Sequence, residues 1–329
     1  MSPPRSVAVI IAAYNVAETI AEAVRSALQQ PETAEVVVVD DASSDRTAEV
    51  VETLARSDAR VKLIRQERNR GPSRARNLAI AATTSPFIAI LDGDDILLPG
   101  RFGAMFAEPD WDFCADNIVF FTRFDQIEAI CRAFADGPAQ RMGLDFAGFV
   151  EGNIPEDGKP RGELGFLKPV MRRDFLERHG LGYREDCRLG EDFLFYAEAL
   201  AKGARYSVIS NCGYAALIRE NSLSGRHSVD DLAQLHRHEV ALADGLDLSE
   251  AQEALLRRRA KSTLRRLHHR QVLATKNERG LAAGISDGLS RPTAFIDIAK
   301  DRWKGLRGKG RDEPFRPRSL LTNANFSRD

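Results

Sequence analysis

The sequence predicts an α/β fold built on a mostly parallel sheet. Short, continuous apolar runs recur through the first part of the chain, at 7–12, 36–39 and 87–91, and 61–64 repeats the pattern weakly. Runs of this kind suit strands that are covered on both faces, as the strands of a parallel sheet are. Helical patterns lie between the runs, and polar residues follow three of them directly. We therefore expect strands and helices to alternate along this half of the chain.

The intervening helices are predicted from apolar residues that repeat at helical spacing. Asn15 followed three residues later by Glu18 is a variant of the capping box, so we expect the first helix to start directly after Asn15. The segment 71–73 forms a turn and the start of the third helix. The apolar positions are Ile20, Val24, Ala27 and Leu28, then Val50, Val51 and Leu54, then Ala75, Leu78, Ala79 and Ala82.

Candidate binding residues stand at the carboxyl ends of three predicted strands. They occupy the segments 13–15, 40–41 and 92–95. In open α/β sheets, ligands bind in the crevice beyond the carboxyl ends of the strands. The three segments are therefore expected to form one binding site.

The acidic segment Leu91-Asp92-Gly93-Asp94-Asp95 is typical of a site for a hard divalent metal. No G-x-G-x-x-G or G-x-x-x-x-G-K-[ST] motif follows any predicted strand, so the backbone phosphate cradles of dinucleotide-binding and P-loop proteins are not predicted. Mg²⁺ and Mn²⁺ prefer one or two protein carboxylates together with ligand phosphates. A metal on Asp92 and Asp94 that bridges two phosphate oxygens would therefore bind a nucleoside diphosphate.

The overall composition is that of an ordinary globular chain. With 329 residues, 43% hydrophobic and 29% charged, it can bury a large core. Lys and Arg (47) nearly balance Asp and Glu (48), so the whole chain is not predicted to bind polyanions such as nucleic acid. Four cysteines without a C-x-x-C pair indicate neither a zinc site nor a disulfide framework and fit a reducing cytoplasm. We expect no signal peptide and no membrane span, which would need roughly 20 apolar residues.

Five short motifs, taken together, give the chain a resemblance to a known family. They read IIAAYN at 10–15, VVDDASSD at 38–45, GPSRARN at 71–77, LDGDD at 91–95 and GEDFL at 190–194. In this order they resemble family 2 glycosyltransferases of the GT-A fold. The resemblance implies a mixed, mostly parallel central sheet flanked by helices, here with a C-terminal helical extension. One departure is Ala13, where the family often has Pro, and it should change loop stiffness more than chemistry.

The resemblance also implies how the nucleotide would be held. Ala13, Tyr14 and Asn15 would line the donor site, with Tyr14 packed near a uracil base. Asp41 would accept a hydrogen bond from that base. Tyr14 is otherwise an aromatic residue at the edge of the core, and Asp40-Asp41 is otherwise a turn and helix cap, because Asp favours such positions for local hydrogen bonding.

The same resemblance places the metal and the diphosphate. Asp94 would be the direct ligand of Mg²⁺ or Mn²⁺, and Asp92 would contact the ribose or a metal-bound water. Arg76 either meets the diphosphate or lies on a solvated helix face. In isolation the D-x-D sequence is common in acidic loops, so its position after a buried strand decides the interpretation.

Catalysis would belong to the later acidic motif. By resemblance, Asp192 is the general base that takes the proton from the acceptor hydroxyl, and Glu191 orients it or binds the acceptor. The alternative is that both are first-turn acids that suit the helix dipole. A single base and an in-line displacement would invert the anomeric centre, so an α-linked donor sugar would give a β-glycoside.

A narrower resemblance, to bacterial exopolysaccharide glucosyltransferases of the succinoglycan type, rests on the general layout and on residues 115–117 and 219–228. It implies UDP-glucose as the leading donor and a saccharide acceptor, lipid-linked in the undecaprenyl-diphosphate form. Galactose, N-acetylglucosamine and rhamnose remain open as the transferred sugar. His227 in this stretch either ligates metal, touches phosphate or is a surface histidine.

The predicted domains are a GT-A domain at 1–230, with a donor half at about 1–110 and an acceptor half at about 111–230, then a helical, basic extension at 231–300 and a disordered tail at 301–329. Helical patterns cover 231–244 and 249–275. The tail is rich in Gly, Arg and Pro, the composition of disordered segments.

The basic helix at 255–276 admits two interpretations. No acid stands between Glu253 and Glu278, and apolar residues form a stripe along it. Such a helix either lies on an anionic membrane surface or packs on the catalytic domain with a solvated basic face. The first interpretation makes the protein cytoplasmic and peripheral at the inner face of the plasma membrane. Aromatic residues are not interleaved with the basic ones, which argues against nucleic acid.

Other classes of protein share single features of this sequence. A metal-dependent phosphatase of the haloacid dehalogenase type also has D-x-D after a strand, but expects Thr or Val after the second Asp, where this chain has Asp95. A nucleotidyltransferase would need a Gly-rich basic loop after the first strand, which residues 13–18 do not offer. A non-catalytic binding protein of the same fold would be favoured by loss of Asp94 or Asp192, and both are present.

Overall fold

The computed structural model describes residues 5–134, 139–155, 164–218, 227–291, 293, 318–322 and 326. Its first half is the predicted alternation of strands and helices. The strands are β1 (Val7–Ala13), β2 (Thr33–Asp40), β3 (Val61–Arg65) and β4 (Phe87–Asp92), and the helices between them are α1 (Ile20–Leu28), α2 (Thr47–Ser57) and α3 (Pro72–Ala81). β1 pairs in parallel with both β2 and β4, and β2 pairs in parallel with β3.

The second half extends the same sheet with mixed strand directions. Within the described residues the order is β3-β2-β1-β4-β8-β6-β9-β5, with β7 on β9 and β10 on β6. β6 and β9 are parallel, whereas β8 runs antiparallel to both β4 and β6. The strands are β5 (Ile96–Leu97), β6 (Phe113–Phe121), β7 (Arg141–Leu144), β8 (Val170–Arg172), β9 (Tyr206–Leu217) and β10 (Arg318–Ser319).

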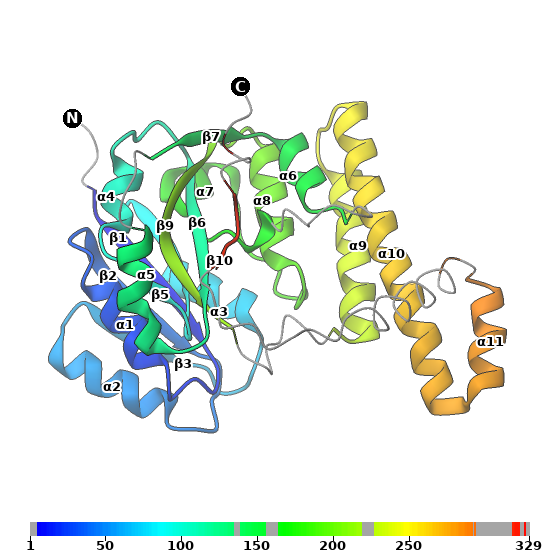
Figure 1. Cartoon of the computed structure of the whole chain (residues 1–329), viewed down its shortest axis with the longest axis horizontal. Coiled ribbons are helices and arrows are strands. Elements are labelled where there is room, and N and C mark those ends of the chain that lie inside the picture. Colours follow the sequence, from blue (N-terminus) through cyan, green and yellow to red (C-terminus); the bar gives the residue numbers. More distant parts are fainter. Residues whose placement is uncertain are drawn as a thin grey trace.

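Helices cover both faces of this sheet (Figure 1). Because side chains alternate along a strand, β1 sends Ile10 into one core and Val9 and Ile11 into the other. The second-half helices are α4 (Arg101–Phe106), α5 (Ile127–Phe134), α6 (Phe146–Gly152), α7 (Arg173–His179) and α8 (Glu191–Ala201). α8 is buried along most of its length.

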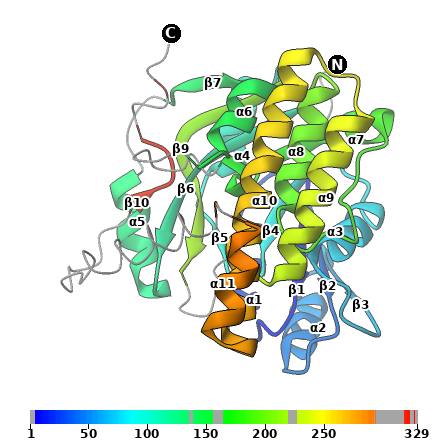
Figure 2. The same cartoon turned by 90° about the vertical axis from the view of Figure 1, so that its right-hand side faces the viewer.

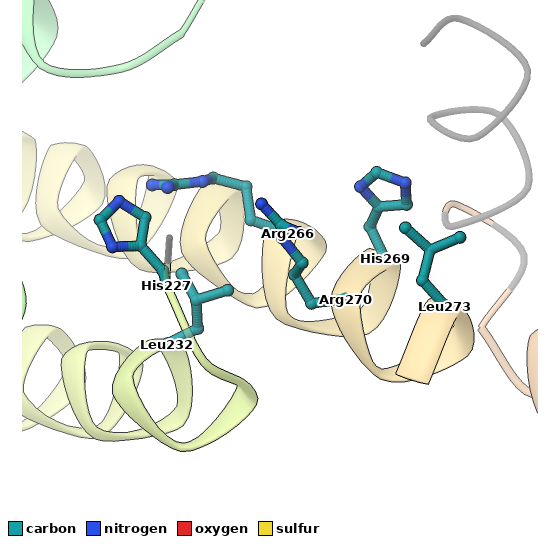
Figure 3. A pocket seen from close by; sticks show the side chains of 6 residues that line it. All are labelled: His227, Leu232, Arg266, His269, Arg270 and Leu273. Carbon is teal, nitrogen blue, oxygen red and sulfur yellow. The ribbon is translucent and has the colours of Figure 1, made fainter. Parts of the chain in front are cut away.

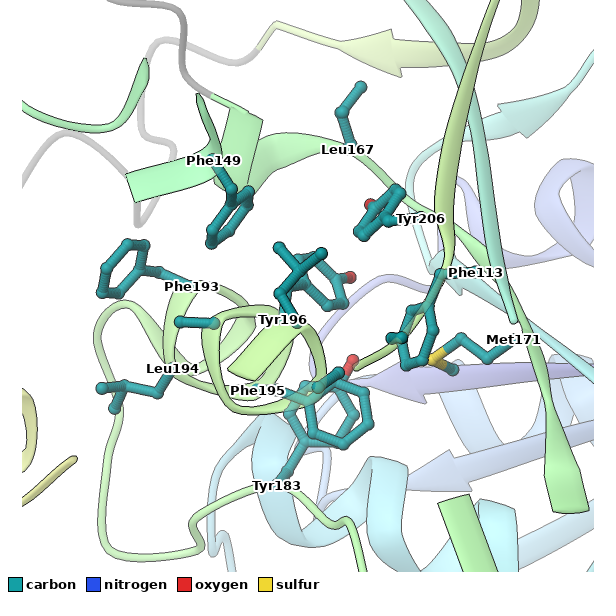
Figure 4. Packing of buried hydrophobic residues seen from close by; sticks show 14 of the residues in the cluster. Phe113, Phe149, Leu167, Met171, Tyr183, Phe193, Leu194, Phe195, Tyr196 and Tyr206 are labelled. Carbon is teal, nitrogen blue, oxygen red and sulfur yellow. The ribbon is translucent and has the colours of Figure 1, made fainter. Parts of the chain in front are cut away.

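Aromatic side chains form much of the core around α8 (Figure 4). Phe195 stacks on Tyr183, with ring centroids 4.4 Å apart, and Phe149 stacks on Phe193 at 5.5 Å. Phe113 of β6 packs against α8 from the sheet side. Aromatic pairs of this kind add stability beyond their buried area. They fix α8, and with it the acidic residues at its start, against the sheet.

The C-terminal helices agree with the predicted helical patterns. α9 (Val229–Gly245) and α10 (Glu250–Arg279) pack side by side against the α6 and α8 side of the molecule, and α11 (Leu281–Leu289) follows at the far end of α10 (Figures 1 and 2). Glu239 and Arg259 form a buried ion pair of 2.9 Å between α9 and α10. In the described part of the chain, no helix has the length and apolarity needed to cross a bilayer.

Two expectations need correction. The first helix does not start after Asn15: α1 begins at Ile20, and Asn15 instead has a positive φ of 53° in the loop after β1. The tail is not disordered throughout, since Arg318–Ser319 pairs with β6 and Leu321 is buried. Asn117 explains this second difference, because its side chain exchanges hydrogen bonds with the backbone of Leu321 at 2.8 and 2.9 Å. Asn117 and the backbone of β6 thus hold this part of the tail together.

Candidate active site

The centre of the candidate site is the buried guanidinium of Arg76 on α3. Its Nη1 donates to Glu191 and to Asp192, each at 3.0 Å, and its Nη2 donates to Asp92 at 3.1 Å. Arg76 therefore joins the acidic turn after β4 to the acidic start of α8, which is 100 residues later in the sequence. Although burial opposes it, the charges of Asp192 and Asp92 raise the pKa of Arg76. Of the two interpretations of Arg76, the solvated helix face is excluded, because the residue is buried.

Lys168 completes this cluster, and sequence reasoning missed it. Its Nζ lies 2.9 Å from Asp192 Oδ2 and 3.2 Å from Asp92 Oδ2. The side chain is buried, in the segment that leads into β8. Asp192 and Asp92 raise the pKa of Lys168 against the effect of burial. Arg76 and Lys168 thus bring the carboxylates of Asp92, Glu191 and Asp192 close together.

The start of α8 presents the two predicted catalytic acids to this cluster. Gly190 precedes them with a φ of 72°, a left-handed conformation that glycine adopts without strain. Glu191 and Asp192 occupy the first turn, where the helix dipole favours negative charge. Burial, together with the adjacent Asp192 carboxylate, raises the pKa of Glu191. Asp192 accepts hydrogen bonds on both oxygens, one from Arg76 and one from Lys168, which fix its orientation.

Tyr214 of β9 holds the acidic segment at the end of β4 through two hydrogen bonds. Tyr214 donates its hydroxyl to Asp95 Oδ2 at 2.7 Å and accepts a hydrogen bond from the Asp92 backbone N–H at 3.1 Å. Burial and the charges of Asp92 and Asp94 raise the pKa of Asp95. Although burial opposes it, Lys168 and Arg76 lower the pKa of Asp92 to about 2. The pKa values of these two neighbouring carboxyls are thus shifted in opposite directions.

Asp41 organises the loop that leads into α3. Its carboxylate accepts from Gln66 Nε2 at 2.6 Å and from the backbone N–H groups of Arg70 and Gly71 at 2.8 and 2.7 Å. Gly71 is the N-cap residue of α3, with a φ of 89°. A carboxylate has about four acceptor sites, so three hydrogen bonds leave room for a further donor.

The loop after β1 lies against the loop after β2. The Asp41 backbone N–H donates to the Ala13 carbonyl at 2.8 Å, and Asn15 Oδ1 accepts from the Ser44 N–H at 2.8 Å. Tyr14 between them is 47% exposed, so it is not a core-edge aromatic residue. The first two of the three predicted strand-end segments are therefore joined directly, and the third meets α8 through Arg76.

The described residues contain no ready-made group of three His, Cys, Asp or Glu side chains that could hold a metal ion. Both Asp92 carboxylate oxygens accept from buried cations, and Asp94, two positions further along, is a partly exposed carboxylate. One protein carboxylate is enough for Mg²⁺ or Mn²⁺ when ligand phosphates complete the coordination. The residues therefore fit a metal that arrives with a diphosphate.

Comparison with solved structures identifies the fold. The crystal structure of S. aureus TarS 1-349 in complex with UDP-GlcNAc matches with a TM-score of 0.58 at 22% identity, over 83% of this chain and 74% of that one. The fold is the GT-A fold of glycosyltransferases.

Sequence comparison then identifies the family. The model of Glycosyl transferase family 2 matches residues 8–132. The chain is 45% identical over 315 residues to the succinoglycan biosynthesis protein ExoU of Rhizobium meliloti (strain 1021), which covers 94% of this chain and 92% of that protein. It is also 38% identical over 96 residues, 29% of this chain and 37% of that protein, to WfgD of Escherichia coli, a UDP-Glc:alpha-D-GlcNAc-diphosphoundecaprenol beta-1,3-glucosyltransferase. The chain belongs to glycosyltransferase family 2.

Two further sequence predictions concern the region after β9. The segment 219–224, part of the stretch that carries the narrower resemblance, lies outside the described residues. His227 lies directly before α9 and lines a pocket between α9 and α10.

Proposed function

We propose that the protein is an inverting glycosyltransferase that moves a sugar from a UDP-sugar to a hydroxyl of a saccharide acceptor. The observation that carries this proposal is that one ammonium group, Lys168 Nζ, lies within hydrogen-bonding distance of both Asp92 and Asp192. The acid of the donor turn and the candidate base thus lie side by side. This is the arrangement needed when one carboxylate binds the donor and the other activates an acceptor beside it.

In this mechanism Asp192 accepts the proton of the acceptor hydroxyl as its oxygen attacks the anomeric carbon. Arg76 and Lys168 hold Asp192 in position, and Glu191 hydrogen bonds to the same guanidinium and orients the acceptor. The bond to the departing UDP breaks on the opposite side of the sugar ring. A single displacement of this kind inverts the anomeric centre, so an α-linked donor gives a β-glycoside.

The nucleotide would bind beyond the carboxyl ends of β1, β2 and β4. We assign the remaining acceptor capacity of Asp41 to the uracil N–H, and the exposed ring of Tyr14 to stacking near the base. Asp94 would hold Mg²⁺ or Mn²⁺, with Asp92 near the ribose. The metal, when bound, offsets the negative charge that grows on the departing diphosphate.

The relatives suggest the substrates. The name of ExoU refers to succinoglycan biosynthesis. The name of WfgD refers to glucosyl transfer from UDP-Glc onto a diphosphoundecaprenol-linked sugar. We therefore propose exopolysaccharide assembly, glucose as the transferred sugar, and a lipid-linked acceptor. The GT-A domain would comprise residues 1–230, with the donor site in 1–110.

We also propose that the protein works at the cytoplasmic face of the plasma membrane, docked through α10 and α11. α10 carries exposed basic residues, Arg258 and Lys261 among them. On α11, Leu281, Ile285 and Leu289 are 64%, 48% and 74% exposed and recur every four residues, which places them on one face. A basic helix beside an exposed apolar face fits the surface of an anionic bilayer.

A screen of UDP-sugars tests the activity. Purified protein is incubated with each donor, with Mg²⁺ or Mn²⁺, and with a membrane lipid extract as the source of acceptor, and UDP release is measured. We expect extract-dependent release with UDP-glucose, loss of release in Asp192→Asn, and normal release in the control Asp174→Asn, an exposed position on α7. No release with any donor, or equal release by Asp192→Asn, would contradict the proposal.

A further inference from the structure

A basic pocket of about 220 Å³ lies between α9 and α10, outside the cluster around Arg76. Figure 3 shows its side chains projecting into one opening from the start of α9 and the middle of α10. Of the described residues that line it, four carry basic or imidazole groups, two are leucines and none is acidic. They are His227, Leu232, Arg266, His269, Arg270 and Leu273.

The pocket is close to the start of α8. Leu232 lines it, and Leu235, about 4.5 Å further along α9 by helical rise, packs against Gly190. A Cβ added to Gly190 would lie only 2.9 Å from a methyl group of Leu235. Gly190 immediately precedes Glu191, which contacts Arg76. The pocket is thus about one turn of α9 away from the residue that packs against the start of α8, the helix that carries the proposed base.

The charge around the pocket favours an anion. The nearby acids of α9 are engaged elsewhere: Asp231 accepts a hydrogen bond from the Ser228 N–H at 3.0 Å, and Glu239, which interacts with Arg266, pairs with Arg259. Arg270 is exposed and has no ion-pair partner within the part of the chain that the structure describes. By contrast Arg257, on another face of α10, pairs with both Asp244 and Glu253.

We propose that this pocket binds the phosphate or diphosphate group of the acceptor. Arginine side chains bind phosphate oxygens through charge-assisted, often bidentate hydrogen bonds. The two leucines suit the first carbon atoms of a lipid chain attached to that group. With the phosphate held here, the sugar on its other side extends toward Asp192. The inference rests on the proposed glycosyl transfer and adds a separate binding site to it.

Binding of inorganic pyrophosphate tests the pocket without any transfer reaction. Calorimetry is done with saturating UDP and Mg²⁺, so that the nucleotide site is occupied. We expect one pyrophosphate per chain, an affinity lowered about tenfold or more in Arg266→Gln/Arg270→Gln, and no change in the control Arg258→Gln/Lys261→Gln on the same helix. Arg270→Gln alone, at an exposed site, is the second variant if the double variant does not fold. Absence of binding, or equal loss in both double variants, would overturn the inference.

Kinetics and vesicle binding together show whether the pocket binds the phosphate of the acceptor or the phosphate of a membrane lipid headgroup. With a lipid-diphosphate-linked saccharide in neutral detergent, Arg266→Gln/Arg270→Gln should raise KM about tenfold or more with kcat retained. Binding to phosphatidylglycerol vesicles should fall equally in this variant and in the control pair. A loss confined to vesicle binding, with KM unchanged, would overturn the inference. If pyrophosphate binds as expected but no UDP-sugar reacts, the proposed transfer fails while the anion site stands.

Discussion

Lys168 Nζ and Asp192 Oδ2 form an ion pair of 2.9 Å, with only 9% and 12% of the two side chains exposed. The same ammonium reaches Asp92 at 3.2 Å, so Lys168 links the turn after β4 to the first turn of α8. Removing one member of a buried ion pair leaves a charge without compensation. Lys168 is therefore expected to stabilise the folded protein and to fix the position of Asp92 relative to Asp192.

Replacing Lys168 by Met should lower the free energy of unfolding by about 3 kcal/mol, the lower end for a broken buried pair, because Asp92 is partly exposed. The control is Lys62→Met, since Lys62 is 54% exposed, pairs with Glu35 at 3.5 Å and should contribute no more than about 1 kcal/mol. Urea denaturation measures both. Equal, small losses would show that Lys168 does not compensate the two carboxylates.

The buried pair of Glu239 and Arg259 should hold α9 against α10. Arg259 also lies over the ring of Phe193, the residue after Asp192, at 4.8 Å. Arg259→Met should cost about 3–5 kcal/mol, whereas Glu239→Leu/Arg259→Met, which removes both charges, should come close to the wild type. A denaturant series on both variants and the exposed control Arg257→Met checks this. A double variant as unstable as Arg259→Met would contradict the assignment.

Glu35 should make stability depend on acid pH. Although burial opposes the shift, hydrogen bonds from Ser85 and Thr84 lower the pKa of Glu35 from 4.5 to about 2. A depressed folded-state pKa stabilises the protein above the unfolded value, and this contribution is lost as the pH falls from about 4.5 toward 2. Glu35→Gln should therefore lose less stability than the wild type across this range. Denaturation at several pH values, with exposed Glu52→Gln as the control, measures the difference. Parallel curves for Glu35→Gln and wild type would refute it.

Much of the donor half could be predicted from the sequence, because its signals are local. Apolar runs indicated β1, β2 and β4, a weaker pattern indicated β3, and the polar residues after β1, β2 and β4 indicated where a ligand would bind. The start of α1 was misplaced, since Asn15 resembles a helix cap in sequence but hydrogen bonds across to the next loop. That contact joins residues 28 and 29 positions apart, which no local pattern reveals.

The interior of the site could not be predicted in the same way. Lys168 belongs to no motif, and its partner Asp192 is 24 residues further along the chain. The only signal was its position between Leu167 and Pro169 in an otherwise apolar stretch, where a lysine must find a counter-ion if it is buried. Arg76 lay within a recognised motif, yet its burial follows from its contacts with the start of α8 and with the ring of Tyr183, whose centroid lies 5.2 Å from its guanidinium.

The central claim is that Asp94 serves donor binding whereas Asp192 serves proton transfer. Calorimetric titration of UDP, in the presence of Mn²⁺, into the wild type, Asp94→Ala and Asp192→Asn tests this claim most directly. We expect Asp94→Ala to weaken UDP binding about tenfold or more, as for a lost charged contact. Asp192→Asn should bind UDP nearly as the wild type does and yet release no UDP from a UDP-sugar. Equal loss of UDP binding in the two variants would contradict the division of roles.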